Sequence, residues 1–159
     1  MITFHQALEA ACSVVERTGP GDLVVELKEG AFKTTVFFVT AEDRRLDYVV
    51  EVAVDAESGK VLTKEDGGLV HLLQPYPVAG GWDKFLSAKQ AYDIAMEALR
   101  GFREYDERGR LTVQLRGDVY YVTFPLIPIT GGSSRSADFA IQVHVDARTG
   151  KVVKLLAAS

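Results

Sequence analysis

The clearest pattern in this chain is an alternation of apolar and polar positions that occurs twice. Tyr48 to Val54 and Phe139 to Val145 both place apolar side chains at every second position. Such alternation is typical of a strand with one face on a core and one wetter face. Both copies continue as Asp-Ala-x-Ser/Thr-Gly-Lys-Val, so residues 48–61 and 139–152 align without a gap.

Two earlier blocks recur in the same order, which indicates an internal repeat. Residues 21–28 align with residues 109–116, and residues 3–7 align with residues 87–91. Thr3 and Ser87 are each followed three residues later by glutamine, which predicts a capping box at the start of a helix. We expect the first helix to end before Gly19-Pro20-Gly21 and the second to end near Arg103.

The remaining apolar runs complete the predicted strands, at 32–39 and 60–63 in the first copy and at 119–129 and 151–156 in the second. The expected fold class is therefore α+β: two tandem repeats, each with one helix packed on an antiparallel sheet of about four strands. We expect the first repeat at 1–66, a connector at 67–85 and the second repeat at 86–159. The sequence leaves open whether the two sheets join.

Composition and charge exclude some functions. The 159 residues are 47% hydrophobic and 25% charged, as in an ordinary globular protein, and the formal net charge is −4. Basic residues are scattered among acids, so we expect no nucleic-acid partner. With Cys12 as the single cysteine, no internal disulfide is possible. No signal peptide and no membrane span is visible, so a cytoplasmic location is the default expectation.

No residue pattern predicts a catalytic site. The Asp-x-x-Ser/Thr-Gly-Lys runs lack the helix that follows a phosphate loop, so they predict hairpin turns. His5, His71 and His144 have no partner at metal-ligand spacing. We therefore expect no enzymatic activity, no metal and no cofactor. A pocket in which Glu51, Gln142 or His144 converge is the alternative that would favour a ligand-binding protein or an enzyme.

The connector carries the one candidate binding motif. Pro75-Tyr76-Pro77 and Trp82 place rigid aromatic side chains on a loop, where they can anchor a partner protein. The alternative, which the pattern favours, is that they cover the seam between the two repeats and need no partner.

The repeated pattern resembles the PepSY domain. The resemblance is carried by Ser87-Ala88-Lys89-Gln90-Ala91 with Ala95, by Tyr48 to Val61 and by Phe139 to Val152, and it covers nearly the whole chain. It implies a helix-on-antiparallel-sheet fold similar to that of cystatins and a bacterial, often extracytoplasmic protein. It also implies a protein-interaction module, or one that binds and restrains a peptidase, and it brings no catalytic residues. The peptidase domain and the membrane or signal segment that accompany many members are not visible here.

Three functional hypotheses follow. The first is a non-enzymatic protein-binding module that restrains or regulates a peptidase. The second is a small acidic immunity-type or stress protein, because an acidic surface can neutralise a basic toxin. The third is a small-ligand-binding protein, or an enzyme whose site the sequence does not reveal. The sequence does not fix the oligomeric state.

Overall fold

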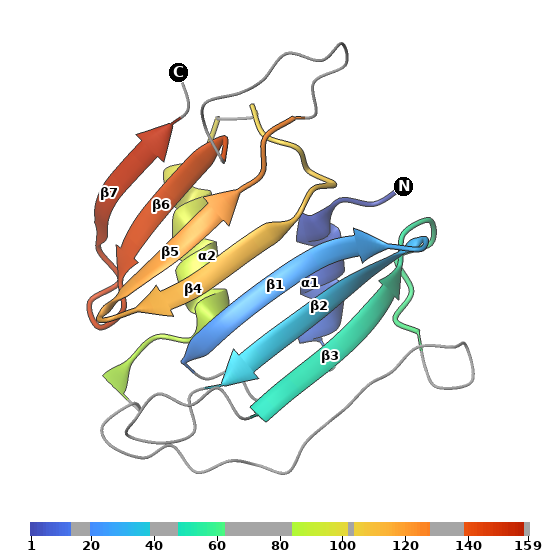
Figure 1. The fold of residues 1–159 in the computed structure, drawn as a ribbon, viewed down its shortest axis with the longest axis horizontal. Coiled ribbons are helices and arrows are strands. Elements are labelled where there is room, and N and C mark those ends of the chain that lie inside the picture. The colour runs from blue at the N-terminus through green and yellow to red at the C-terminus, as the bar shows by residue number, and fades with distance from the viewer. Residues whose placement is uncertain (14–19, 39–47, 63–83, 102–103, 128–138, 158–159) are drawn as a thin grey trace.

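One sheet with two helices on one of its faces makes up the described part of the molecule (Figure 1). The computed structural model describes residues 1–13, 20–38, 48–62, 84–101, 104–127 and 139–157. All strand pairs are antiparallel, and the strand order is β3-β2-β1-β4-β5-β6-β7. The elements are α1 (Phe4–Cys12), β1 (Gly21–Lys28), β2 (Ala31–Phe38), β3 (Tyr48–Asp55), α2 (Ala88–Ala98), β4 (Leu111–Arg116), β5 (Val119–Phe124), β6 (Ile141–Asp146) and β7 (Val152–Ala157).

The predicted fold class, two helix-on-four-strand repeats, is wrong. The described structure is dominated by a single seven-stranded sheet, because β1 pairs with β4 and joins the two predicted sheets. An unpaired β1 would leave backbone groups without partners at a sheet edge, and pairing with β4 removes that edge. The description of the chain as an α+β, PepSY-like tandem repeat is wrong for the same reason, since in the described residues only two short helices accompany the sheet.

The join between β1 and β4 is reciprocal. In the sequence alignment residues 23–25 correspond to residues 111–113. Val24 pairs with Thr112, its own counterpart, and the flanking pairs exchange roles: Leu23 with Val113, and Val25 with Leu111. This register is that of an isologous contact across a local two-fold axis. The two halves of the chain therefore meet as two subunits of a symmetric dimer would.

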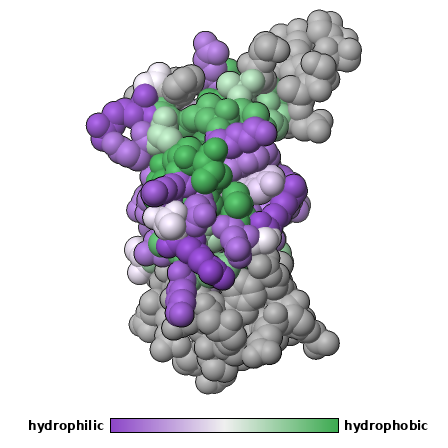
Figure 2. All heavy atoms as spheres, turned by 90° about the vertical axis from the view of Figure 1, so that its left-hand side faces the viewer, coloured by the Kyte–Doolittle hydropathy of each residue, from purple (hydrophilic) through white to green (hydrophobic). Residues whose placement is uncertain are grey.

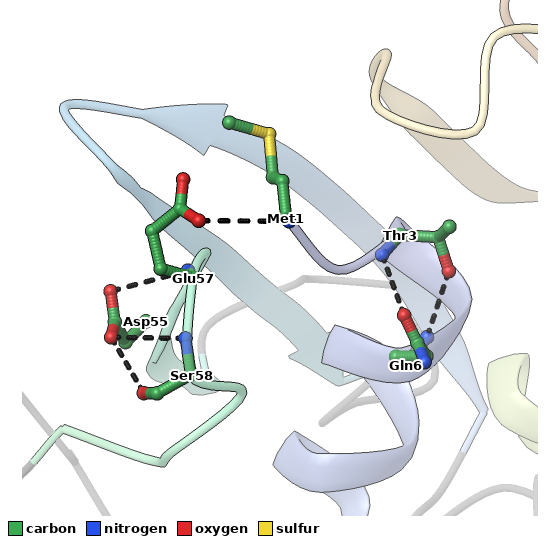
Figure 3. Close-up of polar contacts among 6 residues, drawn as sticks. All are labelled: Met1, Thr3, Gln6, Asp55, Glu57 and Ser58. Atoms are coloured by element: carbon green, nitrogen blue, oxygen red, sulfur yellow. Dashed lines mark hydrogen bonds and ion pairs between the residues drawn. The ribbon is translucent and has the colours of Figure 1, made fainter.

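Both helices begin at the predicted capping boxes. Thr3 Oγ1 accepts the backbone N–H of Gln6 at 3.4 Å, and Gln6 Oε1 accepts the N–H of Thr3 at 2.9 Å (Figure 3). Ser87 and Gln90 repeat this arrangement at 3.1 and 2.8 Å. These bonds satisfy backbone donors that the first turn of a helix leaves unpaired.

The predicted hairpin turns are confirmed. Asp55 accepts the backbone N–H of Ser58 at 3.2 Å and its hydroxyl at 2.6 Å (Figure 3), and Asp146 accepts the N–H of Thr149 at 2.9 Å. The glycine of each turn has a φ of 75° or 76°, a conformation that glycine adopts without strain. After the first turn, however, the strand predicted at 60–63 is reduced in the described residues to an isolated bridge between Val54 and Val61.

A continuous core lies between the helices and the sheet. Alternate strand residues point into it, and α1 packs on β1–β3 while α2 packs on β4–β6 and reaches β1. Because α2 touches strands of both halves, the core does not divide at the β1–β4 join. The largest fully buried side chains are those of Tyr120, Phe4, Phe32, Phe124, Leu8, Leu23, Leu99 and Leu111.

Candidate functional site

Only some of the residues singled out by the sequence lie in the part of the chain that the structure describes. Pro75, Tyr76, Pro77 and Trp82, together with His71, lie outside the described residues. The structure therefore does not test the prediction that the connector binds a partner.

Glu51, Gln142 and His144 do not converge. Gln142 and His144 are neighbours on β6, where Gln142 Oε1 lies 2.7 Å from His144 Nε2. Glu51 lies on β3 and pairs with Lys33 at 3.0 Å. Four strands separate β3 from β6, which places them about 24 Å apart at the usual spacing between neighbouring strands. These three residues therefore cannot line one pocket.

His5 lies between two tyrosines in the helix layer. Its Nδ1 contacts the hydroxyl of Tyr92, and its Nε2 lies 3.1 Å from the hydroxyl of Tyr105. Burial lowers the pKa of His5, opposed by the nearby charge of Glu107, and burial raises the pKa of Tyr92. A neutral imidazole bonded to two neutral phenols ties α1 to α2 and to the segment before β4, which is a structural role.

Other groups able to act as nucleophiles or metal ligands give no site either. Burial raises the pKa of the Cys12 thiol, the opposite of the shift that activates a cysteine. Within the described ranges, no three residues among His, Cys, Asp and Glu gather so that they could hold a metal ion.

The outer strand β7 is the most unusual surface of the described structure. It pairs with β6, and no other described strand lies beyond it. Three of its apolar side chains are exposed: Val152 at 41%, Val153 at 57% and Leu155 at 39%. Figure 2 looks onto this side of the molecule and shows an apolar area bordered by hydrophilic side chains. Most apolar strand residues elsewhere in the sheet are buried or half-buried, so the exposed apolar side chains of β7 are a candidate interaction surface.

The backbone of β7 also offers hydrogen-bonding groups. Asp146 N–H donates to Lys151 O at 2.8 Å, so the next pair, Val145 with Val152, is one whose backbone groups point away from each other. Val152 therefore directs its N–H and C=O away from β6. These groups are available to a further strand.

A bulge interrupts the pairing one residue later. The register shifts between His144 and Val145, which leaves Val153 as the extra residue of β7. Beyond the bulge His144 pairs with Lys154, and the next pair brings Leu155 opposite the buried Val143. In an antiparallel pair, residues whose backbone groups point toward the partner strand alternate with residues whose groups point away from it. Leu155 is therefore the next residue of β7 whose N–H and C=O point away from β6.

Basic residues lie in this strand and in the turn before it, although the guanidinium of Arg148 is directed over the ring of Phe85, 5.2 Å from its centroid. Arg148 and Lys151 lie in the turn before β7, and Lys154 lies within it. Lys154 is on the far face of the sheet, the face opposite the helices, beside His144. There His144 stacks on Tyr121 at 4.0 Å between ring centroids.

The sequence predicts this strand but does not indicate that it has a function. Residues 151–156 were expected to form a strand, and β7 confirms this within one residue. An apolar run with a single lysine is compatible with a buried strand and with an exposed one. Its exposure follows from its place as the last described strand of the sheet, and no local pattern in the sequence indicates that place.

The chain has no match among family models and none among curated proteins. Among solved structures, a crystal structure of a "putative lipoprotein" from Clostridium difficile 630 is similar at 16% identity, covering 98% of this chain and 92% of that one, with a TM-score of 0.40. A similarity of that degree carries no argument about function. Within the described ranges neither helix is long and apolar enough to cross a membrane. The resemblance to PepSY domains stays a prediction.

Proposed function

We propose that this protein is a protein-binding module that receives an extended segment of a partner along the outer edge of β7. In strand addition, backbone hydrogen bonds to a sheet edge supply affinity, and side chains on alternating faces supply specificity. The exposed apolar strand β7, with Val152 and Leu155 directing backbone groups outward, is the observation that carries the proposal.

The edge is protected against indiscriminate pairing over only part of its length. Bulges and lysines on edge strands hinder edge-to-edge aggregation, and β7 has both, at Val153 and Lys154. From Leu155 to Ala157 the pairing with β6 is regular again. A partner segment that accommodates the bulge can form hydrogen bonds along the whole of β7, whereas an arbitrary strand cannot.

The alternatives from the sequence gain less support. An acidic immunity-type protein would offer an acidic surface to a basic toxin, yet the exposed edge carries Arg148, Lys151 and Lys154. A ligand pocket built from Glu51 and His144 is not supported, because these residues lie on distant strands. A peptidase as the partner stays a prediction from the family resemblance. The edge itself selects for an extended segment, whichever protein carries it.

The proposal is tested by removing one outward backbone donor. Peptides that bind the full chain are first selected from a phage-displayed random library. Leu155→Pro deletes an N–H that points away from β6, so the pairing within the sheet is retained. We expect at least about a tenfold loss of affinity for the selected peptides, the result of losing a main-chain bond and blocking the edge. Isothermal titration calorimetry measures the loss.

Two controls separate the edge from other surfaces. Ile127→Ala removes an apolar side chain that is 48% exposed but lies outside the sheet, and we expect it to leave binding unchanged. In the wild-type chain, hydrogen exchange should show new protection of β7 amides when peptide binds. Unchanged affinity in a folded Leu155→Pro variant, or peptide binding without new protection of β7, would overturn the proposal.

A further inference from the structure

We infer that the segment received by β7 is acidic, with a carboxylate beside Lys154 on the far face of the sheet and an apolar side chain beside Leu155 on the helix face. This inference rests on the proposed function and names the chemistry of its partner. The two positions follow from the register, which places Lys154 beside His144 and Leu155 beside the buried Val143. A strand added next to β7 continues the same alternation of faces.

The charge around β7 differs from that of the whole chain. The net charge is −4, but β7 and the turn before it carry three basic residues, Arg148, Lys151 and Lys154. The one acid of that turn, Asp146, accepts the backbone N–H groups of Arg148 and Thr149, both at 2.9 Å. Both bonds are to one oxygen, Oδ1; the backbone N–H groups of Thr149 and Arg148 lower the pKa of Asp146, and the nearby charge of Arg148 contributes to lowering it further. Asp146 thus offsets part of the charge of Arg148, whereas Lys151 and Lys154 have no such acid in the turn or in β7.

The basic residues of this end differ from lysines of the first half in their ion pairing. On β1 and β2, Lys28 and Lys33 form ion pairs with Glu26 and Glu51. Over the described residues, none of the three basic residues around β7 forms an ion pair. The edge thus presents positive charge that a partner can neutralise, which favours association and sets specificity.

The neighbouring far face extends this positive charge. The guanidinium of Arg116 lies over the ring of Tyr121 at 4.8 Å, and Tyr121 stacks on His144. His144 adds little positive charge at neutral pH, because burial and the nearby charges of Lys154 and Arg116 lower its pKa. On this face Lys154 is therefore the charge that an acidic segment beside β7 would meet, because Arg116 lies over β5, two strands further in.

A second copy of the chain fits the same edge less well. Pairing two β7 strands would bring the Lys154 side chains of both copies to one seam, and β7 itself contains no acid to separate them. Like charges brought close across strands are unfavourable. A neutral apolar segment would match Leu155 but leave Lys154 without a partner. An acidic segment matches both.

Two synthetic peptides test the inference. The capped heptapeptides Thr-Val-Glu-Val-Glu-Val-Thr and Thr-Val-Gln-Val-Gln-Val-Thr differ only in charge and have the same alternation. We expect the glutamate peptide to bind the full chain about two- to fivefold more tightly at low salt, the usual size of an exposed ion-pair effect. The preference should fade in about 0.5 M salt, because exposed charges are screened. Calorimetry of both peptides gives the ratio.

Variants at one position locate the preference. Lys154→Gln should abolish the preference for glutamate, and Lys154→Glu should reverse it. Lys60→Gln, which removes one lysine from the turn of the first half, should leave the preference intact. Equal binding of both peptides to the wild-type chain overturns the inference, while weaker binding of both to Leu155→Pro would keep the proposed function. A dimer through β7, found by analytical ultracentrifugation and dispersed by neither peptide, also overturns it.

Discussion

The two halves of the molecule begin alike and end differently. Each has a capped helix, three paired strands and a turn that begins with aspartate and ends with glycine. After the turn the first half forms a single described bridge at Val61, whereas the second half forms the six-residue strand β7. The sequences from Val61 and from Val152 read Val-Leu-Thr-Lys-Glu-Asp and Val-Val-Lys-Leu-Leu-Ala. Apolar residues continue through the second sequence, whereas the first turns to the charged run Lys-Glu-Asp. The candidate binding surface therefore lies on the strand of the second half.

A second difference lies in the core. Phe32 and Tyr120 occupy corresponding positions, because each pairs with the penultimate residue of the preceding strand, and both are fully buried. The Tyr120 hydroxyl donates to Leu86 O at 2.5 Å and accepts the N–H of Gly21 at 3.3 Å. Tyrosine at this position therefore links the start of β1 to the entry of α2, a connection that phenylalanine cannot make.

The largest effect on stability is expected from removing a large buried side chain from the core of the first half. Phe32→Ala should lower the free energy of unfolding by about 3–5 kcal/mol, because it removes a fully buried ring and leaves a cavity. Urea unfolding followed by circular dichroism measures this. We expect one transition, since the sheet and core are continuous. Separate transitions for the two halves would show that the β1–β4 join does not couple them.

A smaller effect is expected from the hydroxyl that distinguishes the halves. Tyr120→Phe should cost about 1–3 kcal/mol, because the N–H of Gly21 and the C=O of Leu86 lose a buried partner. Chemical denaturation of both proteins gives the difference. Tyr121→Phe, which changes a half-buried tyrosine on the far face, is the control and should cost less. Equal losses would mean that the link between halves contributes nothing.

The smallest effect concerns the two turns and depends on pH. The Ser58 hydroxyl lowers the pKa of Asp55, and the backbone N–H of Thr149 lowers that of Asp146. A carboxyl with a depressed folded-state pKa stabilises the fold above its unfolded value, about 3.9, and this contribution is lost as the pH falls through the folded value. The double variant Asp55→Asn with Asp146→Asn should therefore lose less stability on acidification than wild type. NMR titration of each carboxyl checks the direction; an unshifted carboxyl contradicts it.

Local features could be predicted from the sequence, and long-range pairings could not. The capping boxes at Thr3 and Ser87 and the turns at Asp55 and Asp146 depend on side chains within three residues of their partners. The β1–β4 pairing joins residues about ninety positions apart, and an alternating strand pattern does not name its partner. For that reason the sequence left open whether the sheets join.

The candidate site illustrates the same limit. Strand β7 was expected, but its exposure depends on where it lies in the strand order, which only the assembled sheet determines. The sequence shows no partner for His5 at metal-ligand spacing, and the two tyrosines that it contacts, Tyr92 and Tyr105, lie 87 and 100 residues away. The predicted anchors Tyr76 and Trp82 lie outside the described residues and stay a prediction.

The reciprocal pairing of β1 and β4 has a consequence for the number of partners that one molecule can bind. Two identical chains meeting in that register would carry two identical outer edges and would cross-link their partners. Because both halves belong to one chain, the two ends have different sequences, and among the described residues an apolar outer strand after the turn is present only in the second half, as β7. The shared chain also makes the pairing independent of concentration, since both halves belong to one molecule. If β7 is the binding edge, each molecule holds one partner there, and mixtures should form discrete one-to-one complexes instead of extended networks.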